Sequence, residues 1–200
     1  INGLIQILGD VQKAFPTGDN KLVISSMIAA CITFSTKPEA IEALISSNIV
    51  QFLIGNSKKI TDPLIRLNMG ILINNLARHD EKSQRYLGSS QAIELLIGWA
   101  KNSWESEDVR KNALSGLNNM VTNHEDNKNK ASSHIPALLK LAKDKKNTQE
   151  LRKWALDVLG NLCCEHPINQ TKINSDSTFV QILIDLLGEE RLRKKKKKKS

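Results

Sequence analysis

IRLNMGILINNLA at residues 65–77 returns as VRKNALSGLNNMV at 109–121 and as LRKWALDVLGNLC at 151–163. Each copy carries an asparagine near its end, and these residues, Asn75, Asn119 and Asn161, stand 44 and then 42 residues apart. Self-similarity at a fixed period in the low forties is typical of a helical solenoid, in which each unit stacks only on its neighbours. The sequence therefore predicts an array of repeats, and its function is to be sought on a surface that the repeats build.

A second, shorter element keeps the same period. It reads SSNIVQFLIGNSK, SSQAIELLIGWAK, SSHIPALLKLAK and DSTFVQILIDLLG, and its aligned leucines are Leu53, Leu96, Leu139 and Leu183, at intervals of 43, 43 and 44 residues. Thr33 stands 42 residues before Asn75, inside a degenerate copy of the first element, MIAACITFS. The repeats therefore extend over most of the chain.

Each period is predicted to hold three helices. In the best-defined copy a short polar segment spans 79–88, an amphipathic segment spans 91–101 and a longer one spans 105–123. Apolar residues in the two longer segments recur at helical spacing. Asp62 before a proline, and Ser106 before two acidic residues, are helix start signals. No segment alternates with period two for long enough to predict a strand, so the predicted fold class is all-α.

The composition fits a folded intracellular chain. Hydrophobic residues make up 40% of it and aromatic residues only 4%, so aliphatic side chains must fill the core. The odd number of cysteines, Cys31, Cys163 and Cys164, favours a reducing compartment without disulfides. No run of roughly 18 apolar residues and no signal peptide is present. We expect a cytoplasmic protein, and because Ile1 lies within a repeat, a fragment of a longer one.

The net charge of +8 comes from one end of the chain. Residues 191–200 supply eight positive charges, which leaves 21 basic and 21 acidic residues in 1–190. The sequence predicts that 191–200 form a disordered polybasic tail. Such a tail can act as a nuclear localisation signal, contact an anionic membrane or nucleic acid, or only aid solubility. The sequence leaves these roles open.

Several segments resemble the three-helix armadillo repeat. HIPALLKLA at 134–142 is similar to the second helix of that repeat, and ILINNLA at 71–77 and LGNLC at 159–163 are similar to the end of its third helix. The resemblance implies an armadillo-type α-solenoid, with the two-helix HEAT repeat as the alternative. In this register the chain holds a partial repeat, three full repeats, a second partial repeat and the tail, over 1–36, 37–79, 80–124, 125–165, 166–190 and 191–200.

In armadillo proteins the third helices line a concave groove, and an asparagine at the position of Asn119 often binds the backbone of an extended peptide. The resemblance therefore implies a groove that binds a peptide or a helix of a partner protein. Positions four and seven residues before each asparagine share its helix face. The predicted groove residues are Asn68, Asn75, Lys111, Asn112, Ser115, Asn119, Lys153, Trp154, Asp157 and Asn161.

Two features limit this interpretation. Importin-α grooves carry a tryptophan four residues before the asparagine, and the corresponding residues here are Ala29, Ile71, Ser115 and Asp157. Without those aromatic rings, cation–π capture of a nuclear localisation signal loses its basis, so we do not predict an import receptor. The asparagines can also serve only to hold the superhelix together. Trp154 is equally compatible with the groove and with packing between repeats.

No residue pattern indicates an enzyme, a metal centre or a cofactor site. Cys163, Cys164 and His166 lie close in sequence, but adjacent cysteines on a helix point about 100° apart and no second ligand pair has zinc-site spacing. His79, His124 and His166 follow their asparagines at similar distances, where we expect cation-capable side chains to favour the C-terminal ends of third helices. Phosphate-binding loops and nucleophile elbows are absent.

The leading hypothesis is a protein–protein interaction scaffold or adaptor without a small-molecule substrate. The alternative is a regulator of a nucleotide-binding protein. INNLARHDEKSQRYL at 73–87 is similar to helix junctions of Smg-type small-GTPase dissociation stimulators. VRKNALSGL at 109–117 is similar to a helix of armadillo exchange factors for Hsp70 chaperones.

Overall fold

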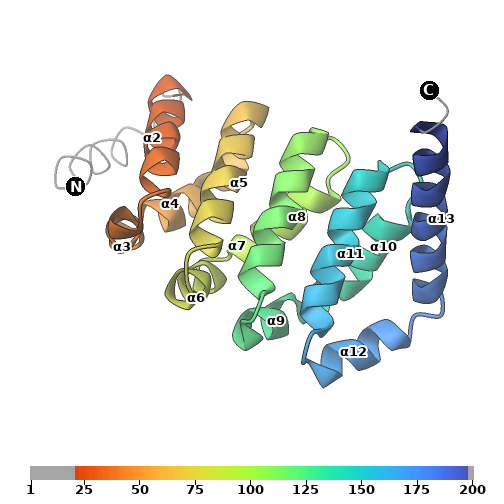
Figure 1. The fold of residues 1–200 in the computed structure, drawn as a ribbon. Coiled ribbons are helices and arrows are strands. Elements are labelled where there is room, and N and C mark those ends of the chain that lie inside the picture. The colour runs from red at the N-terminus through yellow and green to blue at the C-terminus, as the bar shows by residue number, and fades with distance from the viewer. Residues whose placement is uncertain (1–20, 198–200) are drawn as a thin grey trace.

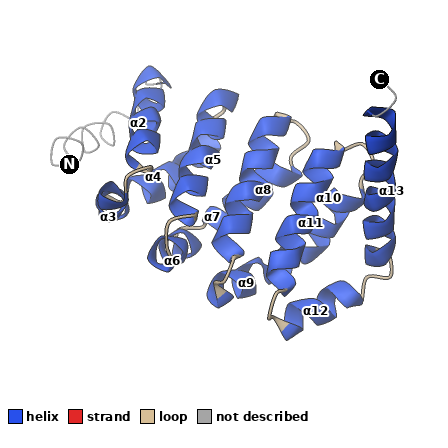
Figure 2. Cartoon of the chain, in the orientation of Figure 1, coloured by secondary structure: helices blue, strands red, loops and turns tan. Residues whose placement is uncertain are grey.

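The computed structural model describes residues 21–197, so the first 20 residues of the expected partial repeat lie outside the description. All regular structure within 21–197 is helical (Figures 1 and 2). A leading helix, α2 (Lys21–Phe34), precedes three complete three-helix units, and a final pair of helices follows them. The units are α3 (Pro38–Ser46), α4 (Ile49–Asn56) and α5 (Pro63–Ala77); α6 (Glu81–Ser89), α7 (Ala92–Lys101) and α8 (Glu107–Val121); and α9 (Glu125–Ala131), α10 (Ile135–Lys143) and α11 (Gln149–Cys163). The final pair is α12 (Pro167–Asn174) and α13 (Phe179–Lys197), and two 3-10 turns cover Ser57–Lys59 and Ser132–His134.

The helices form three parallel rows. The long third helices α2, α5, α8 and α11 stand side by side, and the second helices α4, α7 and α10 lie behind them (Figure 1). The short first helices α3, α6, α9 and α12 cross the lower end of the array (Figure 1). A short first helix in every unit distinguishes this architecture from the two-helix HEAT alternative. The fold is the all-α armadillo-type solenoid that the sequence predicted.

One hydrophobic core runs along the whole array. Leu72, Leu117 and Leu159 of the third helices are buried, as are Leu53, Leu96 and Leu139 of the second helices. Burying each such side chain contributes about 1.5–3 kcal/mol relative to leaving it exposed. Leu183 occupies the matching place on α13 but is 37% exposed, because no third helix within the described residues covers it.

The third helices begin where the sequence signals predicted. The Asp62 carboxylate accepts hydrogen bonds from the N–H groups of Leu64 and Ile65 at 2.9 and 3.1 Å, and Pro63 occupies the first turn. Ser106 and Thr148 cap α8 and α11 in the same way, each through a 3.3 Å bond. Such a cap contributes about 1 kcal/mol, and together the caps fix the register of the row.

The first helices correct one expectation about the histidines. His124 and His166 do not end third helices; they are the N-caps of α9 and α12, and Nδ1 of each accepts from a backbone N–H at 3.3 and 3.2 Å. An accepting Nδ1 carries no proton, so both rings cap as neutral imidazoles and not as cations attracted by a helix C-terminus. In α6 the cap is Asp80, and His79 stands beside it at 2.9 Å.

The C-terminal end also differs from the expected disordered tail. Helix α13 continues through Lys197, so residues 191–197 are helical, and 198–200 lie outside the described residues. Lysine and arginine have high helix propensity, and a helix that has already begun extends at little cost. None of the helices within 21–197 has the length and apolarity to cross a bilayer.

Candidate partner-binding face

The ten predicted groove residues all lie on three adjacent third helices. Asn68 and Asn75 belong to α5; Lys111, Asn112, Ser115 and Asn119 belong to α8; and Lys153, Trp154, Asp157 and Asn161 belong to α11. Lys153 and Asp157 are exposed and the other eight are partly exposed. We refer to this surface of α5, α8 and α11 as the third-helix face.

The periodic asparagines connect each third helix to the one before it. Nδ2 of Asn75 donates to Ser35 Oγ at 3.0 Å, and Nδ2 of Asn119 donates to Asn74 Oδ1 at 2.5 Å. Nδ2 of Asn161 donates to both Asn118 Oδ1 and Thr122 Oγ1 at 2.9 Å. The amide nitrogens therefore hold the superhelix together, which is the structural role that the sequence left open.

The amide oxygens of the same asparagines, unlike the nitrogens, make no hydrogen bond within the described residues. Within the described residues, Oδ1 of Asn75, Asn119 and Asn161 accepts no hydrogen bond, and all three side chains are partly exposed. Each oxygen can therefore accept an N–H from outside the molecule. Asn68 and Ser115 likewise make no side-chain hydrogen bond within residues 21–197. Open polar groups thus recur on consecutive third helices.

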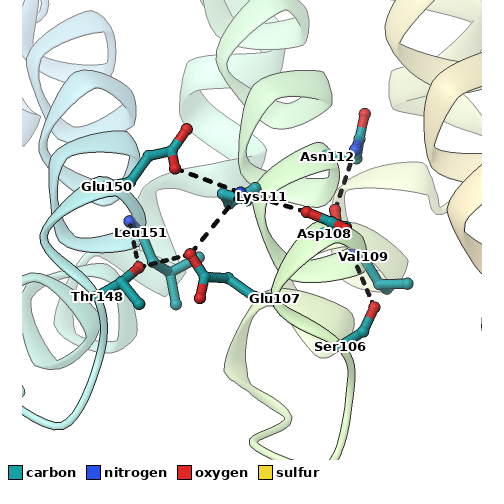
Figure 3. A network of polar contacts seen from close by, with 9 residues as sticks. All are labelled: Ser106, Glu107, Asp108, Val109, Lys111, Asn112, Thr148, Glu150 and Leu151. Carbon is teal, nitrogen blue, oxygen red and sulfur yellow. Dashed lines mark hydrogen bonds and ion pairs between the residues drawn. The ribbon is translucent and has the colours of Figure 1, made fainter.

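Lys111 is the centre of a charged network between α8 and α11 (Figure 3). Its Nζ lies 3.3 Å from Asp108, 3.3 Å from Glu150 and 3.8 Å from Glu107. Thr148 Oγ1 donates to Glu107 at 2.7 Å, and Asn112 Nδ2 donates to the Asp108 carbonyl at 3.0 Å (Figure 3). The hydrogen bond to Asp108, together with Glu150, raises the pKa of Lys111. One ammonium thus faces three carboxylates, and the network is acidic.

The α11 part of the face combines an aromatic ring with charges. Trp154 is partly exposed and packs against the hydrophobic core, which fits the packing role considered for it, while its role in the groove stays a prediction. Desolvation raises the pKa of the Asp157 carboxyl, and the nearby Lys153 ammonium opposes that shift. Lys153 also lines a cavity of about 590 Å³ between α11 and α13, together with Leu156 and Leu186.

A second periodic feature was missed in the sequence. Arg66, Arg110 and Arg152 follow the first apolar residue of each repeated segment, and Nε of each donates to a backbone carbonyl at the end of its unit's second-helix segment, at 2.6, 3.0 and 2.9 Å. The guanidinium groups of Arg66 and Arg110 also reach the next unit, at Glu105 and Asn147. The recurrence of Ile-Arg, Val-Arg and Leu-Arg was the available signal. These arginines stabilise the packing of the repeat units and are not part of the third-helix face.

The cysteines and His166 make structural contacts or are free thiols. Cys31, Cys163 and Cys164 are free thiols, and burial raises the pKa of Cys31 to about 11. His166 uses Nδ1 to cap α12, and its Nε2 lies 3.0 Å from Asn129 Oδ1. The Cys164 carbonyl accepts from Lys128. The His166–Asn129 contact links neighbouring units, whereas the cap and the Lys128–Cys164 bond each lie within one unit.

Comparisons with known proteins show which solved structures have a similar fold. No protein-family model and no curated protein sequence matches the chain. Solved structures do match. A computationally designed armadillo repeat protein for modular peptide recognition aligns with a TM-score of 0.74 at 20% identity, over 91% of this chain and 72% of the other.

Two further structures agree. The designed armadillo repeat protein YIII(Dq)4CqI aligns with a TM-score of 0.64 at 23% identity, over 80% of this chain and 63% of the other. A related designed protein, in complex with the peptide (KR)4, aligns with a TM-score of 0.63 at 18% identity, over 92% and 69%. The chain is therefore an armadillo-type repeat protein in its fold, with three complete units and parts of two more.

Proposed function

We propose that this chain is a protein-binding scaffold whose third-helix face holds an extended segment of a partner protein. The observation that carries the proposal is the repeated open acceptor, Oδ1 of Asn75, Asn119 and Asn161, on three consecutive helices. Packed helices stand about 8–10 Å apart, and an extended peptide rises about 3.3 Å per residue. Successive acceptors would therefore meet peptide N–H groups at intervals of two to three residues.

The contacts refine what the asparagines contribute. A free amide offers a donor and an acceptor to one peptide unit, but here the donor is committed to the preceding repeat. Asn75, Asn119 and Asn161, which we call the asparagine ladder, therefore act as a row of acceptors for peptide N–H groups. Asn68 and Ser115 are the polar groups on the same face that can supply the remaining contacts. Side chains of the peptide that point toward the face would meet Trp154 and Asp157 on α11.

The structural neighbours support the same proposal. One was designed for modular peptide recognition and another was solved in complex with the peptide (KR)4, and both align with this fold. In the adaptor role that we propose, the bound segment belongs to a larger partner. We also propose that the protein is cytoplasmic with access to the nucleus. The basic C-terminal end of α13 would contact an anionic membrane or nucleic acid.

The test uses a peptide selected from a displayed random library against the full chain. Ser115→Arg places a long cation on the third-helix face at a residue that makes no side-chain hydrogen bond. Ser133→Arg makes the same change at an exposed position near α10 and is the matched control. We expect Ser115→Arg to weaken peptide affinity at least about tenfold, with an unchanged melting temperature, and Ser133→Arg to bind normally. Equal affinities in both variants would refute a binding role for this face.

A further inference from the structure

Trp104 is the most exposed large hydrophobic side chain within the described residues. It lies in the loop between α7 and α8 and is 95% exposed, whereas Trp99 of α7 is 6% exposed and belongs to the core. Tryptophan is enriched at protein interfaces, because burying its ring removes a large apolar area from solvent. The position of this ring therefore requires an explanation.

The loop that carries Trp104 is held in place. The Trp104 N–H donates to Asn102 Oδ1 at 3.1 Å, and the Glu105 N–H donates to the Asn102 carbonyl at 3.1 Å. Glu105 is buried and pairs with Arg66 of the preceding unit, and Ser106 caps α8. These bonds hold the loop backbone in place, so little backbone entropy is lost when a partner binds the ring.

The fold itself does not need an aromatic residue here. In the next unit Lys146 occupies the same place, two residues before the helix cap, and its N–H donates to Asp144 Oδ1 at 2.9 Å as that of Trp104 does to Asn102. Both loops also close with a 3.0–3.1 Å backbone hydrogen bond. Because an exposed lysine fills the equivalent position, the tryptophan is not explained by the repeat architecture.

Acidic residues follow Trp104 closely in the sequence and indicate what it could bind. Asp108 lies four residues further on, in the first turn of α8, and its side chain is 69% exposed. Glu150 on α11 is 61% exposed and Glu107 is 40% exposed. Lys111 faces these three carboxylates (Figure 3), and the Arg110 guanidinium also interacts with Glu107, so the group keeps a net negative charge. The helix dipole accounts for acidic residues at these N-termini but not for the ring.

We infer that Trp104, with Glu107, Asp108 and Glu150, anchors a lysine or arginine side chain of the bound partner segment at the edge of the third-helix face. The ammonium or guanidinium group stacks on the indole, and the carboxylates compensate its charge. The inference rests on the proposed function, since it adds a specificity anchor to that face and names the partner as a basic segment.

The experiment uses a fluorescein-labelled (KR)4 octapeptide with the full chain, and an uncharged Gly-Ser octapeptide as the control probe. Fluorescence anisotropy is recorded for the wild type, Trp104→Ala, Trp104→Leu and Trp104→Phe. Ile168→Ala removes a different exposed apolar side chain, 62% exposed on α12, and is the matched control. We expect Trp104→Ala and Trp104→Leu to lose about tenfold in affinity for (KR)4, Trp104→Phe to lose less, and Ile168→Ala to bind normally.

Several results would overturn the inference. One is wild-type affinity for (KR)4 no higher than for the Gly-Ser peptide, and another is equal affinity in Trp104→Ala and Ile168→Ala. Sedimentation velocity would expose a third, a dimer that Trp104→Ala dissociates, which would assign the ring to self-association. Loss of co-sedimentation with anionic vesicles but not of peptide binding would assign it to a lipid surface. In each case a binding defect of Ser115→Arg for the selected peptide would leave the proposed function standing.

Discussion

The first-helix layer and the third-helix face both carry asparagines at a fixed position of the repeat, but they use them differently. Asn127 of α9 and Asn169 of α12 are completely buried, and their Nδ2 atoms donate to backbone carbonyls. Asn119 and Asn161 are partly exposed and donate to side chains of the preceding third helix. Within the described residues Oδ1 accepts no hydrogen bond in any of the four, but only on Asn119 and Asn161 does it belong to a partly exposed side chain. Recurrence in sequence thus marks a repeated contact, and only burial separates a structural contact from a surface available to a partner.

Removing the buried amide of the first-helix layer should have the largest effect. Asn127→Ala leaves the carbonyls of Gln84 and Met120, which Nδ2 contacts at 2.9 and 2.8 Å, without this donor and opens a cavity between α6 and α9. We expect a loss of about 2–4 kcal/mol of unfolding free energy by urea denaturation. Asn174→Ala, an exposed asparagine of α12, should change it by less than about 0.5 kcal/mol. A small effect at Asn127 would remove the distinction between the two layers.

Removing a ladder asparagine should lower the unfolding free energy less than Asn127→Ala does, and should also weaken peptide binding. Asn119→Ala loses the bond to Asn74 Oδ1 and the open acceptor together, and water can replace the lost partner at a partly exposed site. We expect about 0.5–1.5 kcal/mol of destabilisation, and a loss of affinity for the selected peptide. A double-mutant cycle with Asn74→Ala isolates the coupling between the two units. If Asn119→Ala destabilises the chain as expected but binds the peptide normally, the ladder is structural only.

The sequence could predict the fold because repeat packing is periodic. The spacing of Leu53, Leu96 and Leu139 predicted the buried faces, and the start signals at Asp62 and Ser106 predicted the helix boundaries. The candidate face was placed on the third helices by resemblance and by helical spacing. What could not be predicted was the direction of each side-chain bond. Whether an asparagine points to its neighbour or to solvent depends on tertiary geometry, and the neutral capping role of His166 has no local sequence signal.

A smaller effect is expected at the turns that lead into the first helices. Glu165 has a φ of 55°, and Asn123 stands at the equivalent place with a φ of 56°. The left-handed region is unfavourable for glutamate but tolerable for asparagine. Glu165→Gly should therefore raise the unfolding free energy by up to about 1 kcal/mol, whereas Asn123→Gly should leave it nearly unchanged. Equal effects at both turns would mean that backbone strain does not distinguish them.

The smallest effect concerns the charged cap of the third-helix row. The hydrogen bond from Lys21, and then the N–H of Ile65, lower the pKa of Asp62 below its usual value of 3.8. A carboxyl whose pKa is lower in the folded state contributes stability that is fully present above pH 3.8 and is lost as the pH falls through the folded pKa.

Asp62→Asn keeps a side-chain oxygen for the cap but removes the titration. The variant should therefore show a flatter dependence of melting temperature on pH below about 4 than the wild type. Ser106→Ala, which removes an uncharged cap, should lower the melting temperature by the same amount at every pH. Parallel profiles for Asp62→Asn and the wild type would show that the Lys21 contact contributes nothing to the pH dependence of folding.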